Sequence, residues 1–344
     1  QAVPSLTPSM MFSLPPLDRY RHWLSGWAVA LVGLVTTYWW VQQQWQSVAM
    51  VEQTRFTQEA RAFTDALSQR VAANTEIVYG LHNLFALNPQ LGRAEFERVV
   101  SELDAVRRYP GVRNLAFTKR VSHSERAGYE ASIRAELSRD APGAPVFTVH
   151  PPGDRDEYFV VHYIWPLEGN AHMLGMDLSA QPTNLASMHY SRDSGKPVAS
   201  APFDLLQEQT HRPAFVIRIP VFDRAGGHSG GPPPFLGAVA ATIRVYDMVR
   251  ALEAQGYLQG VAVAIEDAGS VREQVADKTV RHLLEFTGQA LPGAPTLVKG
   301  LQVHDRRWRL AFQPTRSLLS PTEQRLPWIA GGQGLWCRAC WGCW

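Results

Sequence analysis

The apolar pattern of the chain begins with a charge-free run over residues 23–41 (WLSGWAVALVGLVTTYWWV). Its length is close to the roughly 20 residues that an α-helix needs to cross a bilayer, and its aromatic end suits the headgroup region. Arg19, Arg21 and His22 precede the run, and the next basic residue is Arg55. The positive-inside rule therefore predicts a cytoplasmic tail over residues 1–22, a transmembrane helix over 23–41, and an external location for the rest.

A second helical pattern follows over residues 42–93. Its residues recur at alternating steps of three and four, with one skipped position at Arg70, which places them on one face of a helix. This stripe consists of Phe56, Ala60, Phe63, Leu67, Asn74, Val78, Leu81 and Phe85. Two interpretations stay open: a parallel dimer stalk in which the polar Asn74 fixes the register, or a helix packed against its own domain. Pro89 and Gly92 end the pattern.

Beyond residue 93 the pattern mixes helices and strands. Helices are predicted over 95–106, 182–190, 246–255 and 275–288. Strands are predicted over 114–120, 146–150, 158–165, 173–178, 197–199, 215–222, 236–245, 261–266, 296–303 and 307–313. Strands and helices do not alternate strictly along the chain, as they would in a fold with a parallel sheet. We therefore expect antiparallel sheets with helices packed on one side, in two successive units over 94–206 and 207–315.

Composition and charge narrow the class of protein. The 344 residues are 45% hydrophobic and 19% charged, as in an ordinary globular protein. The net charge of +2 and the absence of a long basic run argue against a nucleic-acid partner. Cys337, Cys340 and Cys343 have spacing reminiscent of iron–sulfur or zinc ligation, but three thiolates at a chain end make an incomplete site. No metal and no cofactor is expected, and the cysteine-free body suits an oxidising compartment.

Five segments follow one another in a recognisable order. They are YPGVRNLAFTKRV (109–121), EYFVVHYIWPLEGN (157–170), LGMDLSAQP (174–182), SRDSGKPVASAPFDLL (191–206) and FVIRIPVF (215–222). Together with Gly237 and Ala238, which open the segment GAVAATIRV, they resemble the CHASE domain. This domain is the extracellular sensory module associated with cyclases and histidine kinases, and the resemblance covers roughly residues 56–252.

The resemblance implies an α+β fold in which the transmembrane and stalk helices precede two tandem PAS-like units with antiparallel sheets. The membrane-distal unit would hold a small-molecule site. The plant members bind cytokinins, with a carboxylate after the strand that Glu-Tyr begins; Pro166 stands at that place here. Ser200 keeps a hydroxyl where the plant members use threonine. The resemblance therefore favours a bacterial ligand of unknown identity over a cytokinin.

A pocket of aromatic and polar side chains in the distal unit would suit a small, flat, partly polar molecule. The candidate ligand-binding residues are Phe117, Tyr163, Trp165, Asp177, Ala199, Ser200 and Phe203. His162 is a further polar candidate, but it alternates with Tyr163 along the strand, so at most one of the two should face the pocket. Asp177 also suits a helix cap, and aromatic side chains in strands are often core.

The resemblance also implies a second membrane helix and a cytoplasmic output domain. Residues 316–344 should return to the membrane, but Gln333, Arg338 and four tryptophans interrupt the apolar pattern, and a charge within a span is costly. A truncated or frame-shifted second span is therefore expected. The sequence has no GGDEF motif, phosphoacceptor histidine box or P-loop. His228 and Ser229 lie among glycines and prolines and are expected to be solvated, so no catalytic residue is predicted.

These observations predict an extracytoplasmic small-molecule sensing module of a receptor in a bacterial inner membrane, with a parallel homodimer formed through the stalk helix. The alternative is a fragment of a sensor diguanylate cyclase or histidine kinase whose catalytic domain lies downstream. A membrane-anchored periplasmic hydrolase is a third hypothesis. It would need a clustered acid, base and nucleophile, and the sequence nominates none.

Overall fold

The computed structural model describes residues 18–140, 147–204, 212–223, 232–270 and 281–325. The chain divides into two compact units. One unit is Phe56–Ser317, which contains both β-sheets. The other joins Gln1–Arg55 to Leu318–Trp344. The structure is α+β, with a long N-terminal helix and two antiparallel sheets, as the sequence predicted.

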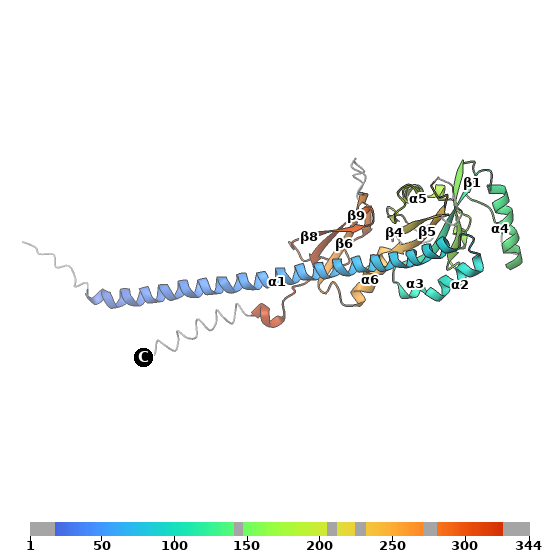
Figure 1. Ribbon diagram of the computed structural model, residues 1–344. Helices are drawn as coiled ribbons and strands as arrows, with labels where there is room; N and C mark the ends of the chain where they lie inside the picture. The colour runs from blue at the N-terminus through green and yellow to red at the C-terminus, as the bar shows by residue number, and fades with distance from the viewer. Residues whose placement is uncertain (1–17, 141–146, 205–211, 224–231, 271–280, 326–344) are drawn as a thin grey trace, which may run out of the picture. The chain divides into compact units, whose positions relative to one another are not determined.

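The first sheet has five strands in the order β2-β1-β5-β4-β3, and every pairing is antiparallel. Its strands are β1 (Val112–Ser122), β2 (Glu157–Trp165), β3 (Val198–Ala199), β4 (Ala214–Phe222) and β5 (Phe235–Arg244). The second sheet has four strands in the order β7-β6-β9-β8. They are β6 (Val261–Ser270), β7 (Arg281–Leu284), β8 (Leu297–Val303) and β9 (Arg306–Pro314). Figure 1 shows β6, β8 and β9 in one group and β1, β4 and β5 in another.

The predicted division near residue 206 does not coincide with the division between the sheets. β4 and β5 were assigned to the second unit, but β5 pairs with β1 and β4 pairs with β5 in the first sheet. Antiparallel pairing at seven positions between β1 and β5 and at nine positions between β4 and β5 outweighs the break in sequence between β3 and β4. The change of sheet therefore comes after β5, at helix α6 (Val245–Ala254).

The helix α1 (Asp18–Leu87) runs through the predicted span and most of the predicted stalk over 42–93. From Phe56 onward it belongs to the unit that holds both sheets, and its apolar stripe is buried there. The ring of Phe63 meets Phe312 of β9 edge-on at 5.9 Å, and Phe85 stacks on Phe117 of β1 at 4.0 Å. Of the two open interpretations, the structure has the helix packed against its own domain.

The polar member of the stripe, Asn74, is fully buried and donates a hydrogen bond to Sδ of Met248 on α6 at 3.4 Å. It therefore contacts its own domain and does not set the register of a dimer seam. The neighbouring Thr75 hydroxyl lies 3.0 Å from Nε2 of His304, at the turn between β8 and β9. The middle of α1 is thus joined by side chains to both the connecting helix and the second sheet.

The other α-helices of the described residues are α2 (Arg93–Leu103), α3 (Ala105–Arg108), α4 (Arg126–Asp140) and α5 (Pro182–Ser194). The prediction of α5 with a proline in its first turn is confirmed. Residues 173–178 and 146–150 were predicted as strands, but among the described residues of these segments only isolated bridges form, His150 with Met176 and Asp177 with Val160, and Met173 and Leu178 belong to short 3-10 helices. The predicted helix over 275–288 is wrong where the structure describes it, because β7 pairs with β6 there.

Within the described residues, no helix is both long and apolar enough to cross a membrane, so the predicted span over 23–41 is not supported. In the unit that contains this segment, Arg55 of α1 makes two hydrogen bonds to the carboxylate of Glu323, at 2.8 and 2.6 Å. Arg55 also donates to the carbonyl of Leu318 at 3.0 Å. Residues 326–344, which hold the predicted second span, and His228 and Ser229 lie outside the described residues.

Gly237 allows the close approach of β5 to β1. Its φ is +150°, and a Cβ atom placed there would overlap the carbonyl oxygen of Thr118. We expect Gly237→Ala to reduce the free energy of unfolding by at least about 2 kcal/mol, since both the backbone conformation and the contact oppose a side chain. Urea denaturation of the two proteins measures the difference.

Gly300→Ala is the matched control. Gly300 also lies in a strand, but a Cβ atom there meets nothing within 4 Å. Its substitution should change the free energy of unfolding by less than about 0.5 kcal/mol. Equal effects of the two substitutions would contradict the assigned approach of β5 to β1.

Candidate functional site

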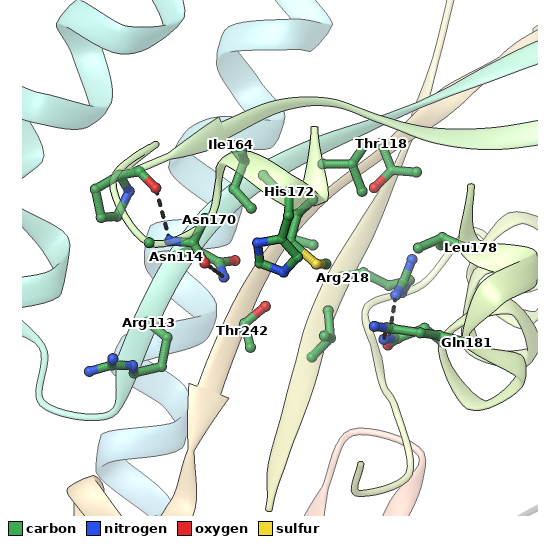
Figure 2. Close-up of a pocket in the computed structure, with 18 of the residues that line it drawn as sticks. Arg113, Asn114, Thr118, Ile164, Asn170, His172, Leu178, Gln181, Arg218 and Thr242 are labelled. Atoms are coloured by element: carbon green, nitrogen blue, oxygen red, sulfur yellow. Dashed lines mark hydrogen bonds between the residues drawn. The ribbon is translucent and has the colours of Figure 1, made fainter. Parts of the chain in front are cut away.

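A cavity of about 190 Å³ lies on one face of the first sheet. Strand side chains alternate between the two faces of a sheet, and seven even-numbered residues of β1, β4 and β5 line this cavity. They are Asn114, Ala116, Thr118, Val216, Arg218, Ala240 and Thr242. β2 adds Val161 and Ile164. Figure 2 shows Thr242, Arg218 and Ile164 around the same space.

Small side chains at the centre of the sheet create this hollow. Ala116 of β1 is paired with Ala240 of β5, and Ala240 is paired with Arg218 of β4. Ile164 of β2 faces Ala116 from the other side. The two adjacent alanines leave a depression between larger neighbours, and larger apolar side chains at these positions would fill it. The floor is therefore apolar in its middle and polar toward its ends.

The segment 166–181 between β2 and α5 covers the cavity. Pro166, Asn170, Met173 and Leu178 of this segment line it. The side-chain amide of Asn170 donates to the carbonyl of Pro166 at 2.9 Å, which closes the first turn of the cover. Asn114 of β1 donates to Oδ1 of Asn170 at 3.4 Å, so the cover is also joined to the floor.

The far end of the cover is held by backbone hydrogen bonds. Gly175 donates to the carbonyl of Val161 at 2.9 Å, and Val161 donates back to Met176 at 2.9 Å. Asp177 donates to the carbonyl of His150 at 2.7 Å. The cover is thus attached to β2 and to the segment before β2.

Arg218 is the charged residue of the cavity wall that lies deepest in the protein. It is 2% exposed and belongs to the middle of β4. Its Nη2 donates to Oδ1 of Asn184 on α5 at 3.3 Å. Its Nε and Nη1 are buried and have no hydrogen-bond partner among the described residues. Burial lowers the pKa of Arg218 to about 9, so the guanidinium still carries its charge at neutral pH.

The rest of the wall is polar at its rim. Arg113, Glu168, His172 and Gln181 line the cavity there. Burial first, and then the proximity of His150, lowers the pKa of His172 below its ordinary value. His172 is therefore mainly neutral at pH 7 and can either donate or accept a hydrogen bond.

Of the predicted site residues, Phe203 lines this cavity. Phe117 and Tyr163 lie on the opposite face of the sheet, against α1 and α2. Phe117 stacks on Phe85, and the hydroxyl of Tyr163 donates to the carbonyl of Leu91 at 3.0 Å. Trp165 ends β2 half-buried, paired with Leu115. These three aromatic residues do not line the cavity.

The predicted polar residues serve as anchors near the cavity. Asp177 is 1% exposed, accepts a hydrogen bond from the backbone of Phe159 at 2.9 Å and lies 3.5 Å from Arg155. The Ser200 hydroxyl accepts from the backbone of Val216 at 2.9 Å. Ala199 donates its backbone N–H to Asp305 at 3.0 Å. Asp177 therefore fixes the end of the cover, and Ser200 fixes the chain next to Phe203.

The expected alternation of His162 and Tyr163 along β2 is wrong, although neither side chain lines the cavity. The register of β2 shifts between them, since Phe117 pairs with Tyr163 and Thr118 pairs with Val161. This bulge leaves His162 unpaired and brings its ring 4.0 Å from that of Tyr163. Burial holds the pKa of His162 well below its ordinary value, and its Nδ1 lies 3.0 Å from the hydroxyl of Tyr129. Both side chains are on the face away from the cavity.

Sequence reasoning missed Arg218 as a site residue. The signal was present, because a single arginine interrupts the apolar strand FVIRIPVF. A charged residue is rarely fully buried unless it has a partner. Such a position in a strand that is otherwise buried indicates either an ion pair or a ligand.

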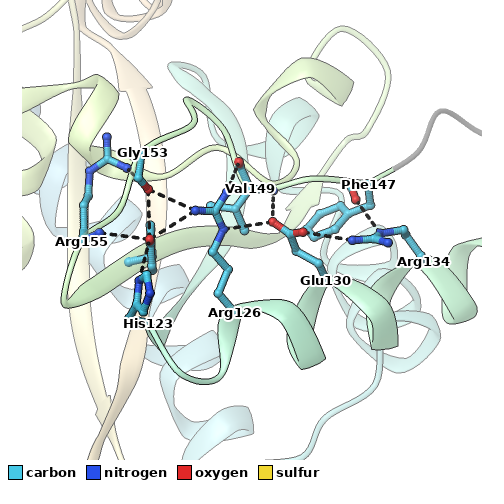
Figure 3. Close-up of polar contacts among 9 residues, drawn as sticks. His123, Arg126, Glu130, Arg134, Phe147, Val149, Gly153 and Arg155 are labelled. Carbon is cyan, nitrogen blue, oxygen red and sulfur yellow. Dashed lines mark hydrogen bonds and ion pairs between the residues drawn. The ribbon is translucent and has the colours of Figure 1, made fainter.

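A polar network on α4 supports the segment that holds the cover (Figure 3). Arg126 donates to the carbonyl of Gly153 at 3.1 Å and to Glu130 at 3.2 Å. Glu130 also accepts a hydrogen bond from the backbone N–H of Val149 at 3.0 Å. Arg134 donates to Glu130 at 3.0 Å and to the carbonyl of Phe147 at 3.1 Å. One carboxylate thus binds α4 to the segment 147–153.

We expect Glu130→Gln to lower the free energy of unfolding at pH 7 by about 1–3 kcal/mol, since hydrogen bonds to a charged group are lost. Burial alone would raise the pKa of Glu130, but the hydrogen bonds from Val149 and Arg126 outweigh it and the net shift is downward. The contribution of the carboxylate is therefore complete above an ordinary glutamate pKa of about 4.3 and is lost as the pH falls through the folded value. Urea denaturation at pH 7 and below pH 4 measures the loss.

Glu102→Gln provides the comparison, because Glu102 lies exposed at the end of α2. This substitution should have little effect at either pH. A difference between wild type and Glu130→Gln that stays constant from pH 7 to pH 3 would contradict the role assigned to the carboxylate.

Comparison with known proteins identifies the family. An extracellular ligand-binding receptor from Desulfohalobium retbaense DSM5692 is similar at 11% identity and a TM-score of 0.46, over 75% of this chain; the match spans 40% of that receptor's chain. The ligand-binding domain of the amino-acid chemoreceptor PctC of Pseudomonas aeruginosa PAO1, in complex with GABA, is similar at 13% identity and a TM-score of 0.39, over 72% of this chain and 93% of its own. No curated protein sequence matches. The model of the CHASE domain matches residues 89–276, more than half of the chain, and the protein therefore belongs to the CHASE family of extracellular sensory domains.

Proposed function

We propose that this chain senses a small molecule outside the cytoplasm and that the molecule binds in the cavity between the first sheet and the cover 166–181. The observation that carries the proposal is the cavity itself, which has an apolar floor, polar groups at its rim and one buried charge. Ligand sites of small molecules have this composition. The proposal places the ligand around Arg218 and Phe203, on the face opposite Phe117 and Tyr163.

Binding can be passed on because β1 contributes to both faces of the sheet. Ala116 lines the cavity, and the adjacent Phe117 stacks on Phe85 of α1. A ligand that favours one position of β1 therefore also favours one position of α1. The ring of Phe215 on β4 meets Trp308 of β9 edge-on at 5.0 Å, which provides a second path to the other sheet. We infer that the output is a shift of α1 relative to its surroundings.

A parallel homodimer through α1 stays a prediction. Its contact cannot use the apolar stripe from Phe63 to Phe85, because that stripe is buried against the sheets of the same chain. A dimer would have to use other residues of the helix.

Filling the cavity should weaken ligand binding without unfolding the protein. Ala240→Leu adds bulk to the centre of the floor and should weaken the affinity for a stabilising small molecule, identified by a thermal-shift screen of wild type, at least about tenfold. At a hundredfold excess over Kd such a molecule contributes about 2.7 kcal/mol. For a domain of this size, the resulting rise in Tm is roughly 5–10 °C in wild type.

Ala131→Leu, on the exposed side of α4, is the matched control and should bind as wild type does. Retained binding in Ala240→Leu would place the ligand elsewhere. A broad screen in which no small molecule raises the Tm of wild type would reject the proposed function.

Attachment to a membrane through residues 23–41, with the N-terminus cytoplasmic, is part of this proposal. Its support is the charge-free run and the large apolar side chains that α1 exposes there. These side chains are Trp27, Val29, Leu31, Val32, Leu34, Val35, Tyr38, Trp39 and Trp40. Exposed apolar area of this kind indicates contact with lipid or with another protein.

Expressed in bacterial cells, the full chain should remain in the membrane pellet after alkaline carbonate extraction. Leu31→Arg combined with Leu34→Arg should release it, since each charge at the centre of a span costs about 3 kcal/mol. Gln43→Arg with Gln44→Arg, just beyond the run, should leave the protein in the pellet. Complete extraction of the unaltered chain would disprove this attachment.

A further inference from the structure

We propose that the small molecule in this cavity carries a carboxylate, and that the carboxylate pairs with the guanidinium of Arg218. The inference rests on the proposed function and names the chemical class of the ligand. Its basis is a fully buried cation at the wall of a cavity, with two of its donor nitrogens unused.

Other buried arginines of this protein have a carboxylate partner. Arg93 lies 3.2 Å from Glu136, and Arg244 lies 3.1 Å from Asp247. Arg218 has only the neutral side chain of Asn184, at 3.3 Å, among the described residues. The contrast indicates that the counter-charge of Arg218 is not supplied by the described part of the chain.

The charge of Arg218 persists although it is buried. Burial lowers its pKa, but only to about 9, so at neutral pH most molecules hold the cation. A buried cation without an anion is unfavourable, because it loses its hydration and gains nothing in return. An anionic ligand would offset this loss by pairing with the guanidinium, whose fork of N–H groups matches the two oxygens of a carboxylate.

The surroundings favour a single negative charge on an apolar body. Ala116, Val161 and Val216 form an apolar floor beside Arg218. One buried cation balances one charge, whereas a phosphate dianion would bring a second charge into the same low-polarity space. Glu168 is the one acidic residue among those that line the cavity in the described ranges, and it is exposed at the rim. It therefore does not compete for Arg218.

The test uses two matched pairs of probes, butyrate with butyramide and benzoate with benzamide. Within each pair the shape is nearly constant and only the charge changes. Titration calorimetry of the full chain should show binding of at least one carboxylate, with a Kd at least about 30-fold lower than that of its amide (about 2 kcal/mol at 1.4 kcal/mol per tenfold). Inorganic phosphate is added as a probe of the other anion class.

Two variants assign the effect to Arg218. Arg218→Met removes the charge at nearly constant volume and should abolish the preference for the carboxylate, while its Tm without ligand is equal to or higher than that of wild type. Arg218→Lys keeps the charge in the same place but loses the fork of N–H groups, so it should retain a weaker preference for the carboxylate. It also tests the inference if Arg218→Met fails to fold. Arg307→Met removes an exposed arginine of the second sheet and should change neither measurement.

The outcomes separate this inference from the proposed function. Amides that bind as well as the carboxylates, or carboxylates that bind Arg218→Met unchanged, would overturn the inference and leave small-molecule sensing in place. Binding of phosphate in preference to all carboxylates would also overturn it. If no carboxylate binds below 10 mM while a neutral screening hit does, the ligand class is wrong and the cavity is still a binding site. If nothing binds, both proposals fail.

Discussion

The packing of the apolar stripe of α1 on two separate sheets is the interaction on which the rest of this structure depends. Phe85 covers Phe117 in the first sheet, and Phe63 covers Phe312 in the second. Since one face of the first sheet is occupied by α1, α2 and α4, the other face is the one left for a ligand. The helix thus decides on which side the cavity lies, and it connects that sheet to the second one.

The cavity and the packing against α1 lie on opposite faces of the same strands. Along β1, residues that line the cavity alternate with residues that contact α1, as the pleat of a strand requires. A change on the ligand side therefore reaches α1 through a single backbone, without a long chain of intermediate contacts. The cover 166–181 forms the opposite wall of the cavity and is hydrogen-bonded both to the floor through Asn114 and to the segment 147–153 through His150.

Arg218 gives this cavity its chemical character. Apolar floors are common, and the amides and hydroxyls at the rim can accept many ligands. A buried cation without a counter-charge discriminates strongly, because only an anion relieves its lost hydration. In a sensor, the buried cation makes binding selective for anions. Pairing of its charge also gives the bound and the free state different energies.

Local pattern in the sequence determined the long helix, most strands of both sheets and the family. Periods of 3.6 and 2 are properties of neighbouring residues, so they are legible without the fold. Tertiary structure alone decided that β4 and β5 join the first sheet and that the stripe of α1 is buried in its own domain. It also decided that a bulge places His162 beside Tyr163 on the face away from the cavity. Each of these depends on pairing between segments far apart in the chain, and a one-residue shift in such a pairing moves a side chain to the other face. For the same reason, the arginine in FVIRIPVF was visible in the sequence, but only the fold revealed that its charge is buried beside a cavity and that no carboxylate in the described structure pairs with it.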